Sequence, residues 1–137
     1  MSDIPPIKRY GRGDRLYIQA QRIWIVIIAF VMRRRPEDRD TMTYGDVAEA
    51  MGLDRRAGHT LGRQLGIIAK FCILNDLPAL NAVVVGEKTG VPGEEVLVRH
   101  GRSIPEEQAD VLEKDWFALR VPTTGTLRKV WEKYFEV

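Results

Sequence analysis

The sequence predicts a single α+β domain, and three observations lead to this prediction. Its 137 residues are enough for one hydrophobic core and suggest no second one. A long apolar helix is expected from Asp14 to about Arg35, where Pro36 blocks continuation. Two further helices joined by a turn at Gly52 are followed by a β-branched run at 80–85, which is typical of a buried strand.

The domain is expected to have three parts. Residues 1–13 form an irregular arm, 14–98 form the core, and 103–137 form C-terminal helices. Lys8 and Arg9 help to make the arm basic, and it is interpreted either as a solvated tail or as an arm that seeks a nucleic-acid groove. The arginine run 33–35 also has two interpretations. It can contact phosphate, or it can serve only to end the helix, since positive charge suits a helix C-terminus.

The expected first helix has apolar residues at steps of three and four, as a core face requires, and further apolar residues on its other sides. Such a helix is central to a fold or part of an interface. Its wholly apolar run, Ile23 to Met32, is too short to span a bilayer. The chain start lacks the pattern of a signal peptide. The sequence therefore predicts a cytoplasmic protein with no membrane partner.

The next segment predicts a helix-turn-helix. Thr43 is positioned to cap a helix in a weak capping box with Asp46, and Gly52 is positioned to end that helix. Asp54 can then cap a second helix from about Arg55 to Leu74. Two helices joined by a short turn with glycine are the signature of this motif.

A small β-hairpin is expected to follow as a wing. Its strands are 80–85 and 95–98, and Lys88 lies at the tip of the connecting loop. This order of elements predicts a winged-helix-like core. Beyond it, Ser103 and Glu106 begin a helix that runs to about Leu119, and Thr126 opens a last helix.

Three glycines recur every four residues in the expected second helix of the motif, at Gly58, Gly62 and Gly66. Each costs about 1 kcal/mol relative to alanine inside a helix, so close approach of another backbone is expected there, from the long helix 14–35. The opposite side of the same helix carries a polar stripe: Arg56, His59, Arg63 and Lys70.

No catalytic residues, metal ligands or cofactors are predicted. Cys72, the sole cysteine, excludes an intramolecular disulfide and is interpreted as a small core residue. His59 and His100 have no partners at metal-ligand spacing. Glu87 and Lys88, with the acidic pair at 94–95, match a metal-dependent nuclease only in an unspecific way. The chain is therefore not expected to be an enzyme.

Nucleic-acid binding has more support. Residues 1–70 hold 13 Lys and Arg against 8 Asp and Glu, while 71–137 hold 8 against 11, so the first half is basic. Basic residues at the start of a recognition helix commonly contact DNA, although a solvated surface helix would show the same pattern. The candidate DNA-binding residues, with DNA in duplex form as the expected partner, are Tyr44, Arg55, Arg56, His59, Arg63 and Lys88.

Residues 41–93 resemble the DNA-binding domain of alkylguanine-DNA alkyltransferases. Tyr44-Gly45-Asp46-Val47-Ala48 matches the family's Tyr-Gly-x-(Ile/Val)-Ala, and the segment 59–65 is similar to Arg-x-Val-Gly-x-Ala-(Leu/Met). His59 stands where the family has an arginine that displaces a base. Pro78-Ala79-Leu80-Asn81-Ala82 is similar to Pro-Cys-His-Arg-Val, with Ala79 in place of the nucleophile. The resemblance implies a winged-helix DNA binder without alkyl transfer.

The alternative function is a protein-interaction module, such as a small inhibitor, an immunity protein or a phage-type accessory protein on the same scaffold. Its interface anchors would be aromatic residues near the C-terminus. If these residues are buried, DNA binding is favoured, and if they form an exposed patch, a protein partner is favoured. They are Trp116, Trp131, Tyr134 and Phe135.

Overall fold

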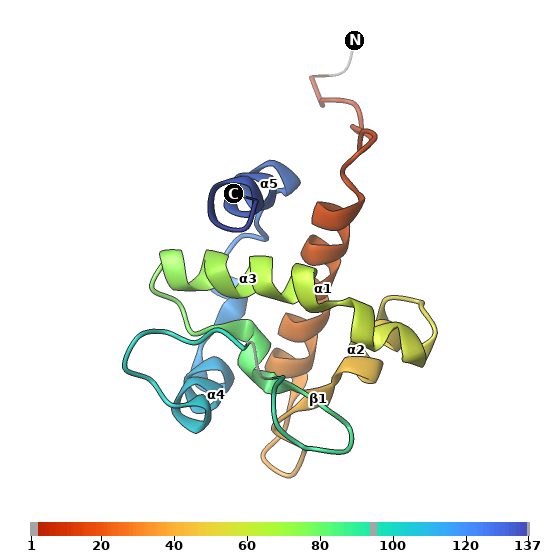
Figure 1. Ribbon diagram of the computed structural model, residues 1–137. Coiled ribbons are helices and arrows are strands. Elements are labelled where there is room, and N and C mark those ends of the chain that lie inside the picture. The colour runs from red at the N-terminus through yellow and green to blue at the C-terminus, as the bar shows by residue number, and fades with distance from the viewer. Residues whose placement is uncertain (1–2, 94–95, 137) are drawn as a thin grey trace.

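The protein is a helix-dominated α+β domain with one small parallel sheet, seen in a computed structural model that describes residues 3–93 and 96–136 (Figure 1). The helices are α1 (Arg15–Arg33), α2 (Tyr44–Ala50), α3 (Gly62–Leu74), α4 (Ile104–Glu113) and α5 (Thr124–Tyr134). Short 3₁₀ helices are η1 (Arg55–Thr60), η2 (Leu80–Val83) and η3 (Trp116–Ala118), and the strands are β1 (Met42–Thr43) and β2 (Val84–Val85).

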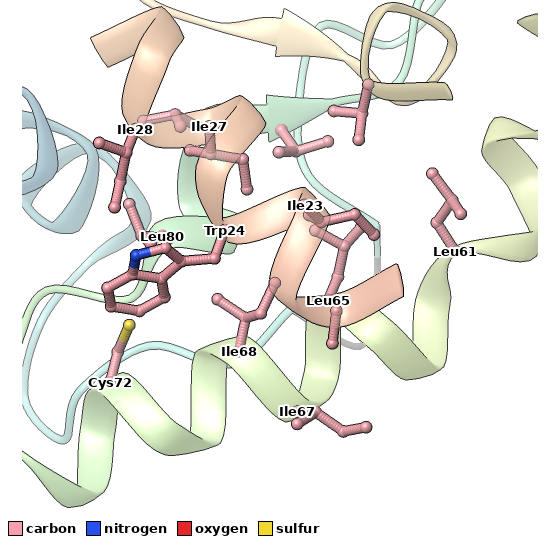
Figure 2. Close-up of a cluster of buried hydrophobic side chains, with 14 of the residues drawn as sticks. Ile23, Trp24, Ile27, Ile28, Leu61, Leu65, Ile67, Ile68, Cys72 and Leu80 are labelled. Carbon is pink, nitrogen blue, oxygen red and sulfur yellow. The ribbon is translucent and has the colours of Figure 1, made fainter. Parts of the chain in front are cut away.

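The core forms where α3 crosses α1 (Figure 1). Ile23 and Ile27 of α1 are fully buried, as are Ile68 and Cys72 of α3, and these side chains belong to one apolar cluster (Figure 2). The step of three to four residues on both helices brings their apolar sides together, as their spacing predicts. Burial of this surface is the main force that holds the two helices in place.

Aromatic rings extend the core to the C-terminal half. Trp24 of α1 meets Phe71 of α3 edge to face, with ring centroids 5.6 Å apart, and Trp116 of η3 at 5.7 Å. The indole Nε1 of Trp116 donates a 2.8 Å hydrogen bond to the carbonyl of Val111 in α4. Trp116 is therefore a core residue and not an interface anchor.

The strand pairing differs from the expected antiparallel hairpin. Met42 pairs with Val84 and Thr43 with Val85, and the two strands are parallel. Residues 80–83 of the expected strand form η2, and residues 96–98 are not a strand, while 94–95 lie outside the described residues. The loop after β2 closes on itself through Gly86, whose N–H donates to the Val91 carbonyl at 2.9 Å, so the chain turns away from β2.

The predicted starts of two helices are confirmed by their capping boxes. Thr43 Oγ1 accepts from the Asp46 N–H while the Asp46 carboxylate accepts from the Thr43 N–H, and Ser103 and Glu106 do the same for α4. Asp14 is different, because its carboxylate makes no cap bond. It accepts instead from the Gly11 N–H and from Arg128, which ties the start of α1 to α5.

Three helix boundaries differ from the expected ones. The helix expected from Arg55 to Leu74 is interrupted at Leu61, which separates η1 from α3 and is itself buried. The helix from Ser103 ends at Glu113 because the next residues turn Trp116 into the core. The last helix begins two residues before Thr126, which donates its N–H to the capping side chain of Thr123.

One described helix, α1, has the length and apolar composition that would allow it to cross a membrane. One face of α1 is buried inside the domain from Tyr17 to Val31, as in a core helix. Its outer side is exposed at Ile25 and Ala29, so α1 is not enclosed on all sides.

Candidate binding groove

A groove of about 860 Å³ runs over the exposed side of α3, and we call it the α3 groove. Its lining comes from five parts of the chain that are far apart in sequence: α2, η1 with α3, η2, the loop before α4, and α5. The residues that line it are Tyr44, Gly58, His59, Gly62, Arg63, Leu65, Gly66, Asn81, Gly93, Val96, Leu97, Trp131 and Phe135.

The three regularly spaced glycines form the floor of this groove. A Cβ on Gly58 would lie 2.6 Å from the Tyr44 carbonyl oxygen, so this position admits no side chain. Gly62 has no atom within 4 Å of such a Cβ, and at Gly66 the nearest atoms are those of the Phe135 ring at 3.7 Å. The expected close approach of another backbone is confirmed at Gly58, but the backbone is that of α2, so the expected contact of these glycines with α1 is wrong. They leave a side-chain-free strip because α1 packs on the other side of α3.

Tyr44 forms part of the first wall. Its hydroxyl accepts a 2.8 Å hydrogen bond from the N–H of Gly93, which joins the start of α2 to a loop that follows 49 residues later. Val96 and Leu97, a few residues further along, also line the groove and give this wall an apolar surface. The wall is thus positioned by a contact that no local sequence pattern contains.

The aromatic side chains of α5 form part of the second wall. Trp131 and Phe135 are stacked, with ring centroids 5.4 Å apart and an interplanar angle of 12°. Phe135 is 37% exposed and Tyr134 38%, whereas Trp116 is fully buried. Lys70 Nζ lies 4.8 Å from the centre of the Tyr134 ring. Of the predicted aromatic anchors, those on α5 reach the surface, and two of them enter the groove.

Asn81 of η2 also lines the groove. It is only 7% exposed, and its Oδ1 is buried without a hydrogen-bond partner among the described residues. An unpaired buried carboxamide oxygen costs roughly 1–3 kcal/mol, so such an atom in a native protein calls for an explanation. In the sequence, Asn81 is notable only as part of the alkyltransferase-like segment. The signal that identifies it is a single amide side chain inside the apolar run 80–85.

Two nitrogen-bearing side chains, His59 and Arg63, lie in the groove lining. His59 bonds through Nδ1 to the carbonyl of Arg56, which leaves its Nε2 without a partner in the described part of the chain. Arg63 is exposed and forms no ion pair with any residue that the structure describes. Arg63 is therefore available for an anionic ligand, and His59 Nε2 is free to make a hydrogen bond to a ligand.

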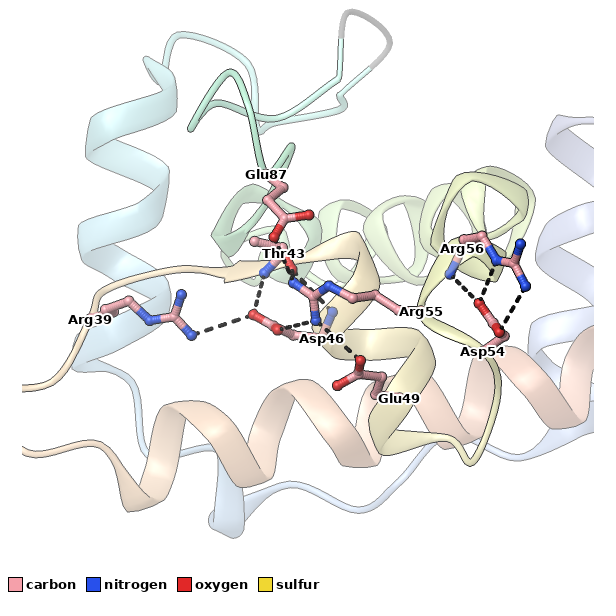
Figure 3. A network of polar contacts seen from close by, with 8 residues as sticks. All are labelled: Arg39, Thr43, Asp46, Glu49, Asp54, Arg55, Arg56 and Glu87. Atoms are coloured by element: carbon pink, nitrogen blue, oxygen red, sulfur yellow. Dashed lines mark hydrogen bonds and ion pairs between the residues drawn. The ribbon is translucent and has the colours of Figure 1, made fainter.

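Arg55 differs from Arg63, because its guanidinium is already paired with acidic side chains of the protein (Figure 3). Its Nη1 lies 2.9 Å from the Asp46 carboxylate and 3.5 Å from that of Glu49, and its Nη2 lies 3.2 Å from Glu87. The hydrogen bond to Asp46 raises the pKa of the guanidinium, which stays charged. Gly45 makes room for this side chain, since a Cβ there would lie 2.6 Å from Arg55 Cγ.

The Asp46 carboxylate is the centre of this network. Its partial burial would raise the pKa, but hydrogen bonds from Thr43 and Arg55 outweigh burial and lower it. Arg39 adds a longer contact of 3.4 Å. The network connects the start of α2, where Tyr44 lines the groove, to η1 and to the loop after β2.

The remaining predicted DNA-binding residues lie outside the groove lining. Arg56 is highly exposed and pairs with Asp54, its neighbour two residues earlier (Figure 3). Lys88 is exposed in the loop after β2. In the run 33–35, Arg34 pairs with Asp40 and Arg35 with Glu37. Of the six predicted residues, the structure thus brings Tyr44, His59 and Arg63 together in the groove lining. Arg55, Arg56 and Lys88 lie outside that lining.

Catalytic groups are scarce around the groove. Within residues 3–93 and 96–136, no cluster of three or more His, Cys, Asp or Glu side chains is placed to hold a metal ion. Cys72 is fully buried under Trp24, and burial raises the pKa of its thiol to about 12 (Figure 2). Ala79, at the position that resembles the family's nucleophile, is also fully buried.

No protein-family model, curated protein or solved structure matches this chain. The resemblance to the alkyltransferase DNA-binding domain therefore stays a prediction that rests on the residues quoted for it.

Proposed function

We propose that this protein binds DNA without catalysis and that the α3 groove is its contact surface. The observation that carries the proposal is that Tyr44, His59 and Arg63, which are candidate DNA-binding residues from sequence alone, line one groove. In this proposal α2, η1 and α3 act as the helix-turn-helix of a winged-helix-like core. The loop 86–93 takes the place of the wing.

Charge supports an anionic ligand at the groove. Arg63 lies in its lining with no carboxylate paired to it in the described residues, while nearby Arg55 and Arg56 are already paired with acids. Phosphates supply the anionic charge that such cations neutralise, and these contacts position a protein on DNA. We therefore expect Arg63 to contribute more to affinity than Arg55.

The walls support contact with bases. Trp131, Phe135 and Tyr44 offer aromatic surface in a groove whose floor lacks side chains. Bases that are unstacked from their neighbours bind to aromatic faces, at roughly 1–3 kcal/mol per base. The groove volume of about 860 Å³ is sufficient for such a base. We infer that an unpaired or extruded base enters the groove while its phosphates lie near Arg63.

The proposal is tested by fluorescence anisotropy with labelled single-stranded DNA, duplex DNA and duplex DNA that holds one unpaired nucleotide, at two salt concentrations. We expect affinity that falls with salt and that is weakened several-fold in Arg63→Ala and further in the double variant with His59→Ala. Arg22→Ala, which removes an exposed charge from α1, is the matched control and should bind normally. Absence of binding to all three DNAs at low salt would exclude the function.

A second candidate is a protein-interaction module, and one observation favours it. Tyr134 and Phe135 are each more than one-third exposed at the end of α5. Exposed aromatic side chains are frequent anchors of protein interfaces. Substituting Tyr134→Ser leaves the lining of the groove unchanged, so a loss of partner capture with intact DNA binding would assign the two surfaces separately. Either function agrees with the cytoplasmic location that we propose.

A further inference from the structure

We propose that the arm, residues 3–13, is a second contact surface for DNA, on which Lys8, Arg9 and Arg12 bind phosphates outside the α3 groove. The proposal rests on the DNA-binding function above and adds a surface that the groove lining does not contain. It arises from exposed cations that have no acidic partner in the described part of the chain, on a segment whose base is fixed beside α5.

The cations of the arm are open to solvent. Lys8, Arg9 and Arg12 are all exposed, and none of them forms an ion pair with any residue in 3–93 or 96–136. Asp3 is the sole acid of the arm itself, so positive charge is in excess there. Duplex DNA carries one negative charge per roughly 1.7 Å of helix axis, and exposed Lys and Arg bind it with release of counterions. The arm is thus complementary in charge to a phosphate backbone.

The base of the arm is held against α1 and α5. Tyr10 Oη donates a 2.6 Å hydrogen bond to Gln21 Oε1 of α1. The N–H of Gly11 donates to the Asp14 carboxylate at 2.8 Å. Asp14 is bound in turn to Arg128 of α5, with 2.6 Å between Arg128 Nη2 and Asp14 Oδ1. These contacts fix the place where the arm leaves the domain, and they leave Asp14 paired with Arg128 and not with the cations of the arm.

Helix α5 connects the base of the arm to the α3 groove. Arg128, which binds Asp14, lies one helical turn before Trp131, which lines the groove. Figure 1 shows the arm leaving the domain at the end of α1 that lies beside α5. From its fixed base at Gly11, the chain can extend by up to about 10 Å to reach Lys8. A nucleic-acid strand that enters the groove at Trp131 can therefore continue past α5 to the arm.

The experiment compares two variants that remove the same charge from different surfaces. Arg9→Ala/Arg12→Ala removes two exposed arginines from the arm, and Arg22→Ala/Arg33→Ala removes two exposed arginines from α1. Arg33 ends α1 far from the arm, and neither Arg22 nor Arg33 lines the groove. Anisotropy titrations of the full chain against duplex DNA with one unpaired nucleotide, at several salt concentrations, give the slope of log affinity against log salt for each variant and for the wild type.

We expect the arm variant to have a slope smaller by about 2, because each lost phosphate contact removes about 0.9 from it. Its deficit in affinity relative to the wild type should then shrink roughly tenfold between about 50 mM and 200 mM salt. Phosphate contacts carry no sequence information. The arm variant should therefore still prefer the duplex with an unpaired nucleotide over the fully paired duplex by the wild-type factor. The α1 variant should keep the wild-type slope.

Arg9→Lys/Arg12→Lys keeps both charges and should keep the wild-type slope, since a phosphate contact requires the charge and not the fork of the guanidinium. A lowered slope in this variant would overturn the phosphate contact.

Other outcomes separate the arm from the groove. If the arm variant keeps the wild-type slope, the arm does not contact DNA, while DNA binding through the groove stands. If the arm and α1 variants lower the slope equally, net charge and not the arm is responsible, and the assignment fails in the same way. If no DNA binds at low salt, both proposals fail together.

Discussion

Gly58 lies against Tyr44 so closely that a Cβ on Gly58 would be 2.6 Å from the Tyr44 carbonyl oxygen and equally close to the carbonyl carbon. This contact joins η1 to the first residue of α2 and brings Tyr44 and His59 to the same groove. The neighbouring atoms are backbone, which cannot move aside as the end of a flexible side chain can.

We therefore expect Gly58→Ala to lower the free energy of unfolding by about 1–3 kcal/mol, as overpacking in a close contact does. Urea denaturation followed by circular dichroism measures this change. Gly62→Ala is the control, because a Cβ at that position meets no atom within 4 Å and should leave stability unchanged or slightly raised. Equal stability of the two variants would contradict the contact.

Gly66 allows stability and binding to be separated. A Cβ at Gly66 meets the Phe135 ring at 3.7 Å, an ordinary van der Waals distance, and alanine is favoured over glycine inside a helix by about 1 kcal/mol. Gly66→Ala should thus be as stable as the wild type or more so, yet it raises the floor of the groove. We expect weaker DNA binding in anisotropy titrations from a fully folded variant, and unchanged affinity would place the ligand elsewhere.

Acid should weaken the network around Asp46. Hydrogen bonds from Thr43 and Arg55 hold the pKa of Asp46 below its ordinary value of 3.8, despite partial burial. The folded state therefore binds this proton less readily than the unfolded chain. The stability from Asp46 is present above about pH 4 and is lost as pH falls through the lower folded pKa.

This dependence is measurable by urea denaturation between neutral and acidic pH. Asp46→Asn should be less stable than the wild type at neutral pH, and the difference between the two proteins should shrink below about pH 4. Other carboxylates whose pKa is lowered, such as that of Asp14, remain in both proteins and contribute equally to the pH dependence of their stability. A constant difference across the pH range would show that Asp46 does not titrate as described.

Cys72 should be unreactive in the folded protein. Its thiol is completely buried beside the core aromatics, and burial raises its pKa to about 12, so little thiolate forms at neutral pH. We expect no reaction with a chromogenic disulfide reagent under native conditions and one equivalent of reaction in denaturant. Rapid labelling of the native protein would mean that this part of the core opens readily.

The sequence by itself predicts the elements whose causes are local. The capping box of Thr43 with Asp46 requires residues three apart, so it is visible without the fold, and Ser103 with Glu106 is visible in the same way. The apolar spacing of α1 predicts its buried face and extent to within two residues. Burial of Cys72 follows from the same reasoning about helix periodicity.

Tertiary structure alone decided which strands pair and which residues form the groove. β1 and β2 are short, and two-residue strands carry no register signal of their own. Their parallel pairing therefore depends on how α2, α3 and η2, which come between the two strands in the chain, pack together. The glycines of α3 are visible in the sequence, but the sequence does not show which side of that helix α1 covers. Only the fold shows that α1 covers the other side and leaves the glycines facing the groove. Asn81 and Phe135 line the groove together with those glycines although they come from distant segments, because packing and not spacing brings them there.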